Sequence, residues 1–208
     1  MKKTLVLVTL SFLLCLSASA ETIKISPTTS LQLTIPSGWL LADEPPQKLL
    51  EEMAEHISHE AAEKGQHPTQ EQLLAAAKNR LSANEALLYN PNTLAFMTLD
   101  FSALKQGERS PSKKSIKLSA KYAGESLEQE EGVSLLTGTS KETKIDGAWY
   151  AYRYDANYQH HDEKMAFAGI IGFSAPHWFF FYYTDYLQDP ADQARSEQLL
   201  ESLKIITQ

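Results

Sequence analysis

Residues 178–183, Trp-Phe-Phe-Phe-Tyr-Tyr, are the stretch of sequence that decides the fold. Successive side chains of a strand point to opposite faces of its sheet, so a strand of this stretch carries aromatic side chains on both faces. The segment 167–173, Phe-Ala-Gly-Ile-Ile-Gly-Phe, is also apolar almost throughout. Strands that are apolar on both faces are typical of sheets covered on both sides. We therefore predict a sheet with helices packed against each face.

The sequence around this stretch predicts an antiparallel meander. The Asp146-Gly147 pair between two alternating runs is a strong hairpin signal. Asn90-Pro91-Asn92 is a second predicted turn. The expected strands cover residues 22–25, 31–35, 86–89, 94–101, 133–145, 148–158, 165–174 and 178–186.

Apolar residues at helical spacing predict the helices. A helical hairpin is expected at about 45–82, with a capping box formed by Thr69 and Gln72 at the start of its second helix. A third helix is expected over 116–131, and a last one begins at Asp189-Pro190. We predict one α+β domain over 21–208, an α/β/α sandwich around an antiparallel sheet.

The N-terminus has the features of a secretory signal peptide. Two lysines precede an apolar run over 5–16, and Ser17-Ala18-Ser19-Ala20 supplies small residues for cleavage between Ala20 and Glu21. The one cysteine, Cys15, follows a leucine where lipoprotein processing needs a small residue, so no lipid anchor is expected. After residue 20, no apolar stretch approaches the roughly 20 residues of a membrane helix. We predict a mature chain that is soluble in the periplasm.

Composition and motifs argue against several functions. The chain has 19 Lys+Arg against 26 Asp+Glu, a formal net charge of −7, which disfavours nucleic-acid binding. It contains no Gly-rich phosphate loop and no Gly-x-Ser-x-Gly motif. Removal of residues 1–20 would also remove the only thiol. We expect a protein that is not an enzyme and has no cofactor.

One group of residues on the first predicted helix has the composition of a metal site. His56 with Glu60, and His59 with Glu63, stand at i and i+4 and would hold a divalent metal if both pairs meet on one face. The order of residues differs from His-Glu-x-x-His. The favoured alternative is a solvated acidic face of an amphipathic helix. The wider acidic set on this helix also includes Glu52 and Glu55.

A second polar group, His160-His161-Asp162-Glu163, is expected at a hairpin tip. It is either a place where metal is taken up from solvent or, more commonly, a polar turn. His177 beside Pro176 is interpreted as a turn residue without a role.

A row of tyrosines is the remaining candidate. Tyr150, Tyr152, Tyr154 and Tyr158 share one face of a predicted strand, and Trp149, Arg153 and Asp155 share the other. The favoured interpretation is the edge of the core. If the row is exposed, it is the predicted protein-binding site, because interfaces are rich in aromatic residues.

Several segments together resemble the PsbP-like α/β/α sandwich group. They are the strand ending Pro36-Ser37-Gly38-Trp39, the hairpin at 143–150, the aromatic strand at 178–183 and the closing helix ending at 200–205. That group includes the extrinsic photosystem II protein, DcrB-like envelope proteins and type VI effector chaperones. The resemblance implies a binding or assembly module, and it transfers no catalytic residue to this chain.

The leading hypothesis is an exported, non-enzymatic envelope protein that binds another protein or peptide. One alternative is a divalent-metal-binding protein or metal-dependent hydrolase that uses the His/Glu helix. Another is a periplasmic immunity protein against a delivered toxin, which an acidic, exported chain would suit.

Overall fold

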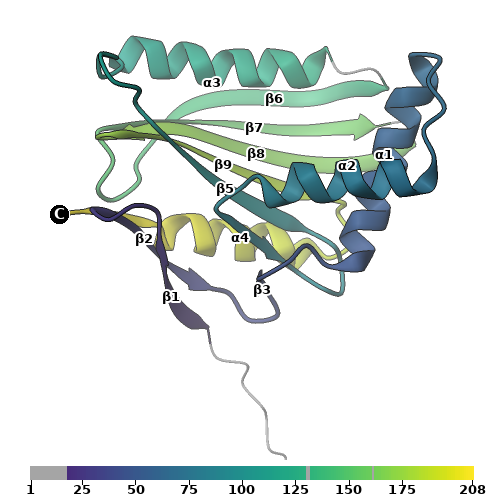
Figure 1. The fold of residues 1–208 in the computed structure, drawn as a ribbon, viewed down its shortest axis with the longest axis horizontal. Coiled ribbons are helices and arrows are strands. Elements are labelled where there is room, and N and C mark those ends of the chain that lie inside the picture. Colours follow the sequence, from purple (N-terminus) through teal and green to yellow (C-terminus); the bar gives the residue numbers. More distant parts are fainter. Residues whose placement is uncertain (1–17, 130–131, 161) are drawn as a thin grey trace, which may run out of the picture.

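The computed structural model describes residues 18–129, 132–160 and 162–208. Its main layer is a seven-stranded antiparallel sheet with the strand order β3-β4-β5-β9-β8-β7-β6. A second, three-stranded antiparallel sheet has the order β1-β2-β10 (Figure 1). The strands are β1 (Ser19–Lys24), β2 (Thr29–Ile35), β3 (Leu40–Ala42), β4 (Ala86–Tyr89), β5 (Phe96–Ala103), β6 (Val133–Thr143), β7 (Tyr150–His160), β8 (Glu163–Ser174), β9 (His177–Asp185) and β10 (Lys204–Thr207).

The helices of the described residues are α1 (Gln47–Glu63), α2 (Gln70–Ser82), α3 (Lys113–Glu128) and α4 (Pro190–Ser202). The predicted capping box of α2 is present, because the Thr69 hydroxyl accepts from the Gln72 backbone N–H and the Gln72 side chain accepts from the Thr69 N–H. Asp189 caps α4 by accepting the Ala191 N–H at 2.9 Å. These local signals set the helix starts.

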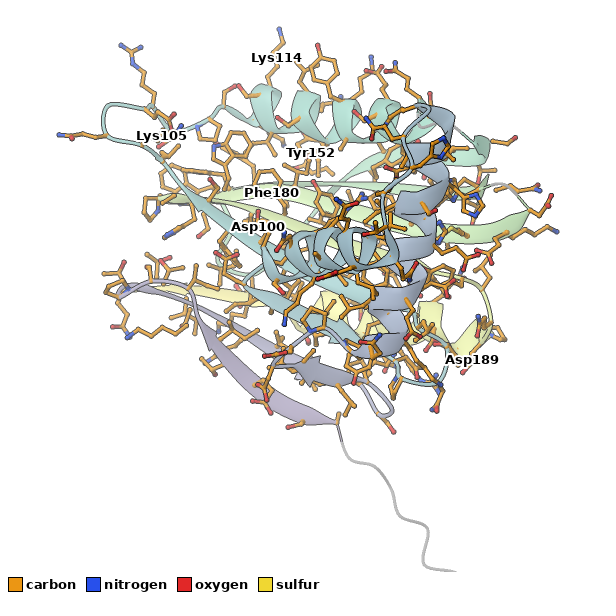
Figure 2. All side chains as sticks on the ribbon, turned by 45° about the vertical axis from the view of Figure 1, so that its right-hand side comes forward. Asp100, Lys105, Lys114, Tyr152, Phe180 and Asp189 are labelled. Carbon is orange, nitrogen blue, oxygen red and sulfur yellow. The ribbon has the colours of Figure 1, made fainter. Side chains whose placement is uncertain are left out.

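The alternation along β9 divides the core into two sides. Phe179, Phe181 and Tyr183 pack in one cluster with β2 and α4, and we name this side the α4 face. Trp178 and Phe180 point to the opposite side, where they pack with residues of α3. We name this side the α3 face, and the hairpin of α1 and α2 covers the rest of it over β4 and β5 (Figures 1 and 2).

The predicted α+β sandwich around an antiparallel sheet is therefore confirmed. One difference concerns the α4 face, where β1, β2 and β10 share the covering role with α4. Lys204 and Ile205, expected to end the closing helix, instead belong to β10, which pairs with β2. Ile205 is 3% exposed in this strand, so pairing buries an apolar side chain that a helical end would leave beside solvent.

The predicted Asp146-Gly147 hairpin turn is also different in the structure. β6 ends at Thr143 and β7 starts at Tyr150, so the connection is longer than a two-residue turn. The Ile205 N–H donates to the Asp146 carbonyl at 2.8 Å, which ties this connection to β10. Gly147 has φ +81°, and a Cβ there would lie 1.9 Å from the Ile205 carbonyl oxygen. Glycine is thus required by both conformation and close approach.

The predicted signal peptide falls mainly on residues 1–17, which, with Cys15, lie outside the described residues. The predicted cleavage site lies inside β1, where Ala20 pairs with Thr34 and Glu21 pairs with Leu33. Cleavage there would leave the strand from Glu21 onward. Among the described residues, no helix combines the length and apolarity needed to cross a membrane.

Candidate functional site

A pocket of about 470 Å³ lies on the α3 face, between the α1–α2 hairpin and α3. The sheet supplies its remaining walls. The lining residues are Met53, His56 and Glu60 of α1, Arg80 and Leu81 of α2 and Asn84 beyond it, Ala123, Ser126 and Leu127 of α3, and Phe96, Thr98, Tyr158, His160, Met165, Phe167, Tyr182, Thr184 and Tyr186 of the sheet and its connections.

Aromatic rings, together with Met165, dominate the sheet side of the pocket. Phe167 and Tyr182 stack with ring centroids 5.8 Å apart. Burial raises the pKa of the Tyr182 and Tyr186 hydroxyls above the ordinary range, so both stay neutral at physiological pH. The walls are therefore mainly apolar, with neutral hydroxyl groups among them.

Two histidines stand together at one end of the pocket. His56 comes from α1 and His160 from the last position of β7, and their Nδ1 atoms are 3.1 Å apart. The His56 ring also stacks on Tyr186, with ring centroids 6.1 Å apart. Burial lowers the pKa of His56, although the negative charges of Glu163 and Glu55 oppose this effect.

Two carboxylates complete this end of the molecule. Glu52, one turn before His56 on α1, and Glu163, the first residue of β8, each have an oxygen close to the His56 ring. One ligand atom from each of the three residues lies within 4.8 Å of the others. Burial raises the pKa of Glu52, and the negative charges of Glu163 and Glu55 raise it further. We name Glu52, His56 and Glu163 the carboxylate–histidine cluster.

The predicted metal ligands of α1 do not all meet in this cluster. His59 is exposed and lies 4.0 Å from Glu55, while Glu60 lies 3.9 Å from Arg80 of α2. The side chain of Glu63 is outside the described residues. Among the described side chains of the predicted set, His56 alone contributes a ligand atom to the cluster.

The structure instead brings together parts of two polar groups that lie far apart in the sequence. His56 belongs to the helix group, and His160 and Glu163 belong to the predicted hairpin tip. Glu52 belonged to the wider acidic set on this helix but not to the predicted ligands, although its i, i+4 spacing to His56 is the same as that of His56 to Glu60. His161 lies outside the described residues, and His177 is buried, with Nδ1 3.4 Å from the Thr29 hydroxyl.

The tyrosine row of β7 lies mostly beneath α3. Tyr152, Tyr154 and Tyr158 are 7%, 7% and 6% exposed, whereas Tyr150 is 38% exposed. Figure 2 shows Tyr152 between α3 and the sheet. A Cβ at Gly124 of α3 would lie 2.5 Å from the Tyr154 ring, so the helix sits directly on the row. The row was predicted to bind a protein if it is exposed, and of its four tyrosines only Tyr150 is exposed.

Comparison with known proteins identifies the fold. No protein-family model matches the sequence, and the search of curated proteins finds no relative. The structure resembles that of LpqN, a Mycobacterium tuberculosis protein described as involved in cell envelope biogenesis, with 12% identity, a TM-score of 0.52 and 91% of each chain covered. It also matches cyanobacterial PsbP from Synechocystis sp. PCC 6803, with 9% identity, a TM-score of 0.43 and coverage of 84% of this chain and 86% of that one.

The LpqN match shows a shared fold at an identity too low to transfer a function, and the weaker PsbP match adds no argument of its own. The resemblance inferred from sequence is one of fold alone, and the LpqN match is the finding that supports it.

Proposed function

We propose that this chain is an exported envelope protein that binds another protein or peptide by taking a bulky apolar side chain into the pocket of the α3 face. The observation that carries this proposal is the pocket itself, whose volume of about 470 Å³ falls in the range of specific binding sites. The proposal describes a binding module and requires no chemical step.

The lining supports an aromatic or long aliphatic side chain as the occupant. Phe96, Phe167 and Tyr182 offer ring faces, and Met53 and Met165 offer flexible, polarisable contacts. Buried aromatic anchors of this kind carry much of the energy in protein interfaces.

The polar side chains at the rim of the pocket are suited to bind the peptide backbone on either side of that anchor. Glu60 and Arg80 lie 3.9 Å apart at the mouth, and both side chains are about half exposed. They supply an acceptor and several donors for the polar backbone on either side of the anchor.

Export to the periplasm is part of the same proposal. It is supported by the basic, apolar and small-residue segments of residues 1–20. The fold is shared with an envelope protein, which is compatible with this location and names no partner.

Site-specific photocrosslinking in cells tests the proposal. A benzophenone amino acid is placed at Ser126, an exposed pocket residue of α3, and separately at Lys117, an exposed residue of the same helix outside the pocket. We expect a discrete protein or peptide adduct at Ser126 and none at Lys117. Ala123→Phe, which fills the pocket from α3, should abolish the adduct while melting temperature and circular dichroism stay normal.

Either of two results would contradict the proposal. One is that the adduct at Ser126 persists in the Ala123→Phe variant although that variant is folded and its pocket is filled. The other is an adduct of small-molecule mass, which would assign the pocket to a metabolite or lipid. If a protein is captured, its identity also tests the immunity alternative, because a toxin would then be the adduct.

A further inference from the structure

The carboxylate–histidine cluster lies at one end of the pocket, where His56 is a lining residue, and its two carboxylates have no role in the function proposed above. Its residues come from two parts of the chain, since Glu52 and His56 lie on α1 while Glu163 begins β8. Imidazole nitrogen and carboxylate oxygen are the ordinary protein ligands of Zn²⁺ and similar divalent ions. Ligand atoms within 4.8 Å of one another can converge on one ion with only side-chain adjustment, because ligands bound at about 2 Å lie about 3–4 Å apart.

The charge around the cluster also favours a cation. In the described part of the chain, no lysine or arginine nitrogen lies within 4.0 Å of the Glu52 or Glu163 carboxylate. Two carboxylates close together repel one another, and Glu55 adds a third negative charge nearby. A divalent ion between them would neutralise that repulsion.

The second histidine gives His56 a defined orientation. Nδ1 of His160 lies 3.1 Å from Nδ1 of His56, and His160 is only 9% exposed at the end of β7. When His56 donates its Nδ1–H to His160, the lone pair of His56 Nε2 is left for an ion. Metal-binding histidines are commonly held in one tautomer by such a hydrogen bond from the other ring nitrogen.

We infer that Glu52, His56 and Glu163 form a binding site for a divalent transition-metal ion of the zinc type, with His160 positioning His56. Three protein ligands leave at least one coordination position for water or another donor. The bound ion links α1 to the start of β8, and so fixes the hairpin against the sheet at one end of the pocket. This inference is independent of the pocket's occupant.

Calorimetric titration with ZnCl₂ tests the site, using the full chain without a polyhistidine tag after EDTA treatment and dialysis. We expect one Zn²⁺ per chain, confirmed by native mass spectrometry. Glu163→Gln should weaken binding at least tenfold, and its exposed position leaves folding intact. Glu52→Gln should act similarly. His59→Gln is the matched control on the same helix, because His59 is exposed and outside the cluster, and should leave affinity unchanged.

A thermal shift provides a second measurement. Zn²⁺ that binds the folded chain raises its melting temperature. We expect that rise in the wild type and the His59→Gln variant, and a much smaller rise in Glu163→Gln at the same Zn²⁺ concentration. Absence of Zn²⁺ binding, equal affinity of the wild type and Glu163→Gln, or an equal loss in His59→Gln would each overturn the inference.

The role of His160 is tested by rescue. His160→Asn keeps an acceptor near the ring of His56, whereas His160→Leu removes it. We expect His160→Leu to lose about tenfold in Zn²⁺ affinity and His160→Asn to lose less, as found for residues that orient metal ligands. Equal losses in two variants of equal thermal stability would remove His160 from the site.

Discussion

The α4 face and the α3 face of the same sheet differ in how the charged side chains beside their cavities are paired. Each carries a hollow, of about 370 Å³ on the α4 face and about 470 Å³ on the α3 face. In the α4-face hollow, Arg153 donates to Glu197 at 2.7 Å, and Lys141 lies 3.2 Å from Asp155. Charges there are paired within the chain. At one end of the other hollow, one carboxylate oxygen each of Glu52 and Glu163 and a ring nitrogen of His56 all lie within 4.8 Å of one another.

The two faces also differ in how continuously their buried side chains pack. The buried side chains of the α4 face form one continuous cluster that includes β2, β9, α4 and β10. Those of the α3 face are divided among several smaller clusters under α3 and the hairpin. The α4 face therefore has the more continuous buried core, and the two proposals above rest on features of the α3 face.

The largest expected difference between the faces is the cost of deleting an aromatic ring. Phe181 is 1% exposed in the α4-face cluster, so Phe181→Ala should lower the free energy of unfolding by about 3–5 kcal/mol. Phe167 is half-buried and already borders the pocket, so Phe167→Ala should cost only about 1–2 kcal/mol. Urea denaturation of both variants measures the difference, and equal losses would remove the contrast.

The next effect concerns Asp192, a fully buried carboxylate on the α4 side. It accepts hydrogen bonds from Trp39 Nε1 at 3.3 Å and Asn90 Nδ2 at 2.8 Å, from the Thr93 hydroxyl, and from Arg195 at 3.1 Å. Asp192→Asn keeps the size but removes the charge and turns one acceptor into a donor among donors. We expect a loss of about 3 kcal/mol by urea denaturation. A loss below about 1 kcal/mol would show that this network contributes little.

A smaller difference in the free energy of unfolding is expected when one carboxylate on each face is neutralised. Glu197→Gln breaks the pairing with Arg153, which is only 9% exposed, and should cost about 1 kcal/mol. Glu163→Gln should cost nothing in metal-free protein, because it relieves repulsion with Glu52. Denaturation in EDTA measures both. A larger loss in Glu163→Gln than in Glu197→Gln would reverse the assignment of paired and unpaired charge.

The smallest expected effect is a pH dependence from His56. Burial depresses its folded-state pKa below the ordinary 6.5, so the folded chain binds fewer protons than the unfolded chain as pH falls. Its contribution to stability is therefore present above about pH 6.5 and is lost as pH falls toward the folded-state value. Denaturation of metal-free protein at pH 7.5 and 5.5 should show a decrease that is smaller in His56→Gln.

His67→Gln is the control for this measurement, since His67 is an exposed histidine beyond α1 and is not among the charges that shift the pKa of His56. It should keep the wild-type decrease. A wild-type decrease that His56→Gln leaves untouched would assign the pH dependence to other groups. Glu52 acts with the opposite sign because its folded pKa is raised, so its contribution is lost as pH rises.

Local patterns predicted most of the elements because their physical causes are local. The capping box at Thr69 and the Asp189 cap act within one turn of helix. The alternation in 178–183 follows from strand geometry and correctly required cover on both faces. The ends of the chain were less predictable. β10 forms because the edge of β2 is available for pairing. Since β2 lies far from β10 in the sequence, no pattern near residue 204 indicates this pairing.

The candidate site was predicted only in part for the same reason. His56 was identified from helical spacing, but its neighbours His160 and Glu163 lie more than one hundred positions further along the chain. Spacing on one helix favoured His59, Glu60 and Glu63 equally, since it does not say which of these side chains meets a residue from another element.

By itself, the sequence determined most of the helices and strands and that the sheet is buried on both faces, because these depend on periodicity and on capping over a few residues. Tertiary structure alone decided what covers each face. It placed α3 over the tyrosine row, β10 beside β2, and α1 where His56 meets the end of β7 and the start of β8. Those contacts depend on how whole elements pack against one another, and no pattern of neighbouring residues encodes them.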